Sequence, residues 1–110
     1  MAEGIEISVE ALAERLRSGE PTLLLDVREP WEHELARLPG SLLLPLGELP
    51  DRAEEIEVDD ETLVVVYCHH GVRSLSGAIL LRRAGIESAV SLAGGIDAWS
   101  RRIDPSVPRY

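Results

Sequence analysis

The sequence predicts an α/β fold in which a small, mainly parallel central sheet carries helices on both faces. Short apolar runs alternate along the chain with amphipathic segments, as strands alternate with helices in parallel sheets. The runs are continuously apolar, which is typical of strands that are covered on both faces. The 110 residues are expected to form one domain over 1–110, with a core at 5–102 and a C-terminal tail at 103–110.

The apolar runs place the strands. In chain order we expect strands at 23–27, 42–44, 63–67 and 89–92, after a short extended start at 5–7. The carboxyl ends of parallel strands lie at one edge of the sheet, and ligands bind outside that edge. Cys68 directly follows the third run, so we expect it at this edge.

Capping and stop residues place the helices. Ser8 is a good N-cap residue and Gly19 a good stop, so we expect the first helix between them. Pro30 is suited to the first turn of the second helical segment, and Gly85 ends the helix after the third run. In chain order the predicted helical segments are 9–17, 30–35, one or two turns within 49–56, 74–84, and the residues after Gly94-Gly95 through Trp99.

The charge balance narrows the choice of partners. The chain has 20 acidic against 11 basic residues, all of them Arg, and a net charge of -9. This field repels nucleic acid, so we predict no nucleic-acid partner, whereas a small anion can still find one positive pocket. No apolar run is long enough to span a bilayer and the first residues do not resemble a signal peptide, so we expect no membrane partner and a cytoplasmic location. The many charges and the absence of Lys, Asn and Gln favour the hypothesis of a thermophilic source.

The loop after the third run carries the predicted chemistry. Cys68 is the single cysteine, so the chain has no intramolecular disulfide and no CxxC pair. The residues 69–73 lead from it into a helix, and backbone N–H groups of such a loop and helix start converge on one point. Gly71 permits the positive φ that a curled loop needs. We expect these amides, the helix dipole and Arg73 to favour a Cys68 thiolate, which can attack a soft electrophile.

Four stretches of this chain together resemble the rhodanese family of sulfurtransferases. They are Leu25-Asp26-Val27-Arg28-Glu29 with Trp31-Glu32, Leu38-Pro39-Gly40-Ser41 running to Pro45, Cys68-His69-His70-Gly71-Val72-Arg73-Ser74, and Leu92-Ala93-Gly94-Gly95-Ile96-Asp97-Ala98-Trp99. They occur in order and with compatible spacing, so the resemblance covers about residues 5–102. It implies a rhodanese-like fold.

The resemblance also implies a persulfide mechanism that needs no cofactor. Cys68 would take a sulfane sulfur from a small anionic donor such as thiosulfate and pass it to cyanide, a thiol or a protein acceptor. The substrate-binding residues would be His69, His70, Gly71, Val72 and Arg73, whose backbone would hold the terminal sulfur. Arg73 would bind the donor's anionic oxygens. His69 stands where many thiosulfate-using members carry Arg or Lys, so less positive charge is expected there.

Two other functions stay open on the sequence. A non-catalytic binding module would keep the fold without the reaction. A phosphatase or an arsenate reductase would use a similar anion-binding loop after the cysteine, but one that is longer than the four residues between Cys68 and Arg73. The short loop favours a sulfur atom over a tetrahedral phosphoryl group.

The supporting residues and the metal question complete the predicted site. Ser74 opens the helix after the loop, Asp26 is expected to accept from loop amides, and Arg28 is expected to pair with Glu32 or Glu34. We predict no metal at Cys68, His69 and His70, because neighbouring side chains of a strand-loop should point apart and wider zinc spacings are missing.

Overall fold

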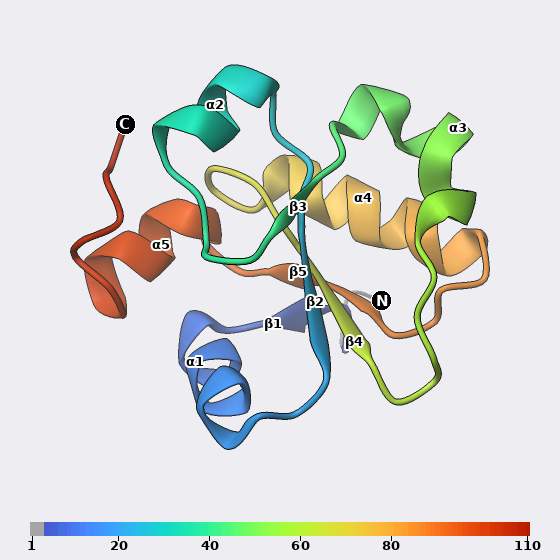
Figure 1. The fold of residues 1–110 in the computed structure, drawn as a ribbon, viewed down its shortest axis with the longest axis horizontal. Coiled ribbons are helices and arrows are strands. Elements are labelled where there is room, and N and C mark those ends of the chain that lie inside the picture. Colours follow the sequence, from blue (N-terminus) through green and yellow to red (C-terminus); the bar gives the residue numbers. More distant parts are fainter. Residues whose placement is uncertain (1–3) are drawn as a thin grey trace.

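The computed structural model of the chain describes residues 4–110. It contains a five-stranded sheet in the order β1-β5-β4-β2-β3, in which every neighbouring pair is parallel (Figure 1). The strands are β1 Glu6–Ile7, β2 Thr22–Asp26, β3 Leu42–Leu43, β4 Leu63–Tyr67 and β5 Ala89–Leu92. The predicted α/β class with a mainly parallel sheet is confirmed.

The helices begin and end close to the predicted positions. They are α1 Val9–Ser18, α2 Pro30–Leu35, α3 Leu49–Arg52, α4 Val72–Arg83 and α5 Gly95–Arg102, with single 3₁₀ turns at η1 Leu46–Glu48 and η2 Ala53–Glu55. Ser8 caps α1 as predicted, because its side chain accepts a hydrogen bond from the Ala11 N–H at 3.0 Å. Gly19 ends α1 in the left-handed region, at φ 78°. Two boundaries differ by more than one residue: α4 starts at Val72 instead of 74, and α5 continues past Trp99 to Arg102.

The helices cover both faces of the sheet, as predicted. Alternate residues of β4 enter two separate cores because successive side chains of a strand point to opposite faces. On one face Val64 and Val66 share a buried cluster with the α4 residues Ala78 and Leu81. On the other face, Val65 and Tyr67 pack in a cluster with residues of α1 and α5, namely Val9, Leu12, Ile96, Ala98 and Trp99. Figure 1 shows α4 and α1 on opposite sides of the strands.

This topology sets the position of Cys68. The strand that precedes it, β4, lies between β5 and β2, and all three strands run in the same direction. Cys68 therefore follows the middle strand at the carboxyl edge of the sheet, beside the loops that leave β2 and β5. Among residues 4–110, no helix combines the length and apolar character that crossing a bilayer requires.

Candidate active site at the Cys68 loop

Cys68 lies at the centre of a tightly curled loop. Its Sγ accepts hydrogen bonds from the Gly71 N–H at 3.1 Å and from the Ser74 N–H at 3.3 Å. Gly71 has φ 103°, a conformation that turns the loop back on the sulfur and that favours glycine. The thiol itself is only 1% exposed. Two N–H groups aimed at one sulfur atom stabilise negative charge on that atom.

Two buried serines extend the contacts of the sulfur. The Cys68 thiol donates to Ser74 Oγ at 3.4 Å, and Ser74 Oγ lies 2.8 Å from Ser91 Oγ. Both serines are fully buried. When the thiol is ionised, the Ser74 hydroxyl can rotate and donate to the sulfur while Ser91 donates to Ser74. Ser91 is not among the residues predicted for the site; the one feature in the sequence that could indicate it is a hydroxyl group within the apolar run of β5.

The first turn of α5 holds the loop from outside. The N–H groups of Ile96 and Asp97 donate to the carbonyl oxygens of Cys68 and His69, at 2.9 and 3.1 Å. These two hydrogen bonds tie the start of the loop to α5. Gly95 makes the approach possible, since an added Cβ would lie 2.5 Å from the Cys68 oxygen and 2.4 Å from the His69 oxygen.

Arg73 points to α2. Its Nη1 and Nη2 donate to the two carboxylate oxygens of Glu32 at 2.8 and 2.9 Å. Glu32 is 3% exposed, and its hydrogen bonds with Arg73 lower its pKa to about 2 against the opposing effect of burial. The same contact raises the pKa of Arg73. Arg73 is thus present at the end of the loop, as the sequence indicates, but its charge is matched by a carboxylate that the sequence analysis did not place in the site.

The Glu32 carboxylate is expected to make acid stability depend on this pair. Its pKa is lowered from 4.5 to about 2, so its contribution to stability is complete above pH 4.5 and is lost as the pH falls toward 2. A shift of this size corresponds to about 3 kcal/mol at most, because Arg73 is 37% exposed and water screens the pair. Glu32→Gln should lower the free energy of unfolding at pH 7 by a similar amount, and urea titrations should show the difference from wild type shrinking toward pH 2. A difference that is constant with pH would contradict this assignment.

Asp26 and Arg28 form a fully buried ion pair beneath the site. Arg28 donates from Nε and Nη2 to the two Asp26 oxygens at 2.8 and 2.7 Å, and both side chains are 0% exposed. Asp26 also accepts from the Arg28 N–H at 3.0 Å, as predicted for loop amides. The predicted pairing of Arg28 with Glu32 or Glu34 is wrong. Asp26, two residues away, accepts two hydrogen bonds from the Arg28 guanidinium group instead. Among residues 4–110 the hydrogen-bond partners of the Cys68 sulfur are Gly71 and Ser74, so neither Asp26 nor Arg28 is bound to it.

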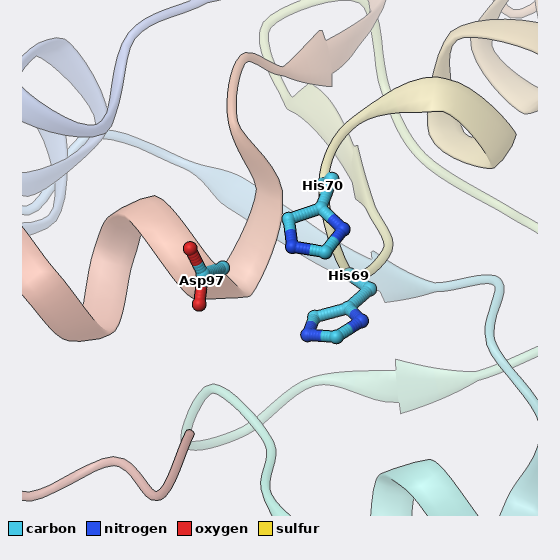
Figure 2. A group of neighbouring side chains, drawn as sticks. All are labelled: His69, His70 and Asp97. Carbon is cyan, nitrogen blue, oxygen red and sulfur yellow. The ribbon is translucent and has the colours of Figure 1, made fainter. Parts of the chain in front are cut away.

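The remaining loop residues lie on the outside of the loop. Val72 is the first residue of α4 and is 78% exposed. The rings of His69 and His70 stack at a centroid distance of 3.9 Å, so the expectation that these neighbours point apart is wrong. Figure 2 shows both rings beside Asp97 of α5, and ligand atoms of the three residues lie within 4.8 Å of one another.

The Asp97 carboxylate already binds two guanidinium groups. Its oxygens accept from Arg101 Nε at 2.9 Å and from Arg109 Nε at 3.0 Å. Partial burial alone would raise the pKa of Asp97, but these two hydrogen bonds outweigh it and lower the pKa. Two positive groups on the carboxylate oppose a metal cation at the His69, His70 and Asp97 cluster.

His69 is held as a neutral ring. Burial is the main cause that lowers its pKa below the usual 6.5, and the neighbouring His70 adds to the effect. Its Nε2 is one of two buried side-chain nitrogen or oxygen atoms in residues 4–110 that have no hydrogen-bond partner. At neutral pH the loop therefore offers a donor anion little charge from His69.

Comparisons with known proteins agree with this fold. The family model described as rhodanese-like domain matches residues 8–102. The chain is 39% identical over 102 residues to a protein of Allochromatium vinosum named sulfurtransferase, and the match covers 93% of this chain and 94% of that protein. It is 35% identical to Bacillus subtilis YrkF, of which it spans 52%, and 32% identical to Mycobacterium tuberculosis MoeZ, of which it spans 28%.

Solved structures give the same result. The human single-domain sulfurtransferase TSTD1 matches with a TM-score of 0.79 at 27% identity, over 89% of this chain and 96% of the other. A rhodanese-related protein of Thermoplasma volcanium matches with a TM-score of 0.80 at 30% identity, over 96% of this chain and 98% of the other. With the family match spanning most of its length, this chain belongs to the rhodanese-like domain family.

Proposed function

We propose that this protein is a sulfurtransferase that carries sulfane sulfur as a persulfide on Cys68. The observation that carries the proposal is the cradle of the Cys68 sulfur, which accepts from the N–H groups of Gly71 and Ser74 at 3.1 and 3.3 Å. Such donors favour a thiolate nucleophile and then hold negative charge on the transferred sulfur. The relative named sulfurtransferase, which this chain matches over 94% of that protein's length, supports the same chemistry.

The proposed reaction has two displacement steps. In the first, the Cys68 thiolate attacks the sulfane sulfur of thiosulfate, the S–S bond of the donor breaks, and sulfite leaves with the bonding electron pair. In the second, cyanide or a thiolate attacks the terminal sulfur of the persulfide and the Cys68 thiolate is released. Electrons and atoms balance over the cycle, so no cofactor takes part. A free reactive thiol is stable in a reducing compartment, for which reason we place the protein in the cytoplasm.

The donor site offers little net charge. Arg73 is bound to Glu32 through both carboxylate oxygens, and burial keeps the pKa of His69 low. A strongly anionic donor would therefore gain less here than in a loop with a free cation beside the cysteine. We expect thiosulfate to serve as an assay donor and less charged persulfides or thiol-bound sulfur to be used more efficiently.

The test is a paired assay of the purified protein. Thiocyanate formation from thiosulfate and cyanide should be catalysed, whereas p-nitrophenyl phosphate should not be hydrolysed faster than in buffer. Phosphate release without thiocyanate would identify a phosphatase instead. No turnover of either substrate, with Cys68 unmodified by any sulfur donor, would identify a binding module.

Donor use is also expected to depend on the charge of His69. Because the pKa of His69 lies below 6.5, the ring gains its positive charge only as the pH falls below that value, and the KM for thiosulfate should fall with it. His69→Arg should lower the KM at pH 7 and flatten the pH dependence. The measurement is the KM between pH 5 and 8, compared with the iodoacetamide alkylation rate to correct for ionisation of Cys68. An Arg variant with the wild-type KM would show that His69 does not meet the donor.

A further inference from the structure

Tyr110 packs on the active-site loop from a distant part of the chain. It lies at the end of the tail that follows α5 and that runs toward α2 (Figure 1). Its ring stacks on His69 at a centroid distance of 4.0 Å and an interplanar angle of 6°. The Trp31 ring meets it edge-on, at 6.0 Å and 78°. One aromatic ring thus covers the side chain that directly follows Cys68.

The Tyr110 hydroxyl is fixed between two ionised side chains. It accepts from Arg28 Nη1 and donates to Glu32 Oε2, both at 2.7 Å. Burial and the Glu32 carboxylate raise the pKa of Tyr110 to about 12. The phenol therefore stays protonated, and keeps donating, over the pH range in which the protein can be assayed.

Glu32 links this hydroxyl to the other end of the loop. The carboxylate that accepts from Tyr110 also accepts the two hydrogen bonds from Arg73, at 2.8 and 2.9 Å. Tyr110 therefore acts on the first and the last residue of the 69–73 segment. It contacts His69 directly and reaches Arg73 through Glu32.

The tail has anchors that do not depend on this ring. Val107 is buried, and its carbonyl accepts a hydrogen bond from the buried Ser100 hydroxyl. Arg109 binds Asp97 at 3.0 Å. Replacing the Tyr110 side chain should therefore leave the course of the tail in place, so that the effect of the ring can be measured by itself.

We propose that Tyr110 is a positioning residue for the active-site loop, with its ring fixing His69 and its hydroxyl fixing Arg73 through Glu32. The inference rests on the proposed sulfurtransferase function, because the 69–73 loop is the segment that would bind the donor. A loop whose two ends are held in one arrangement needs no ordering when the donor binds. Tyr110 fixes this arrangement although it lies outside the 69–73 loop.

Two variants separate the ring from the hydroxyl. Tyr110→Phe keeps the stack on His69 and removes the hydroxyl's bonds to Glu32 and Arg28, whereas Tyr110→Leu removes the stack as well. The first readout is the pKa of the His69 ring, measured by NMR. His69 also faces His70, Asp97, Glu32 and the backbone of Tyr110, all of which both variants keep. Loss of the covering ring should raise the pKa of His69 toward 6.5 in the Leu variant, and the Phe variant should keep the wild-type value.

The second readout is kcat/KM for thiosulfate. It should fall about tenfold in Tyr110→Leu and by less in Tyr110→Phe, since a misplaced binding group of this kind costs at least that much. A Leu variant with the wild-type pKa of His69, or with the wild-type kcat/KM, would overturn the proposal. The His69 titration needs no sulfur donor. A wild-type protein that neither turns over nor takes up sulfur on Cys68 would therefore refute the proposed function, while the titration still decides the role of the ring.

Discussion

Replacement of Cys68 by serine is expected to abolish sulfur transfer and to leave the fold intact. Serine is nearly isosteric with cysteine, and its hydroxyl can take the place of the sulfur beside the N–H groups of Gly71 and Ser74. It cannot form a persulfide, and the chain contains no second cysteine. Thiocyanate formation should therefore fall to the uncatalysed background.

The controls for this variant are its stability and a second change in the cradle. The urea midpoint of Cys68→Ser should stay close to wild type, because the serine still fills the buried position. Ser91→Ala removes the hydroxyl partner of Ser74 and keeps the thiol, so it should lower the rate without abolishing it, by about tenfold. Sulfur transfer that persists in the Cys68→Ser variant would contradict the assignment of Cys68 as the nucleophile.

Gly95→Ala is expected to have the largest effect on the folded loop itself. The new Cβ would lie 2.4 to 2.6 Å from backbone atoms of His69 and Cys68, and Gly95 has φ 62°. Neither the loop backbone nor the first turn of α5 can move away without losing the hydrogen bonds that join them. Overpacking and backbone strain together should lower the free energy of unfolding by about 3 kcal/mol or more, and sulfur transfer should be lost with the loop geometry.

Gly40→Ala is the matched control. Gly40 also has a positive φ, of 78°, but nothing lies within 4 Å of an added Cβ. It should therefore cost only the conformational strain, about 1 kcal/mol, and sulfur transfer should be unchanged. Equal urea midpoints for the two alanine variants would show that α5 does not hold the Cys68 loop in the close contact described above.

The fold could be predicted because its signals are local. The strands 63–67 and 89–92 coincide with β4 and β5, since continuous apolar runs of this length have one main structural use in an α/β chain. The ends of α1 follow from Ser8 and Gly19, whose own side chain or backbone conformation caps the helix. The prediction was less accurate where a segment packs on a distant one: α5 extends to Arg102, three residues past the predicted end, and the tail packs on it through Val107.

The candidate site could be predicted only where it is local. Cys68 and Ser74 are six residues apart and meet through the loop between them. Other contacts join distant residues: Glu32 is 41 residues from Arg73, and Tyr110, which Arg28 binds in addition to the nearby Asp26, is 82 residues from Arg28. A guanidinium group can pair with any carboxylate in reach, so the sequence leaves its partner undetermined until the fold brings them together.

Intact mass spectrometry after incubation with thiosulfate tests the central claim most directly. The wild-type protein should gain the mass of one sulfur atom and lose it again on addition of cyanide or dithiothreitol. The Cys68→Ser variant, treated in parallel, should gain nothing. A wild-type protein whose mass does not change with thiosulfate or with a less charged persulfide donor, while its thiol is still alkylated by iodoacetamide, would contradict the persulfide on Cys68.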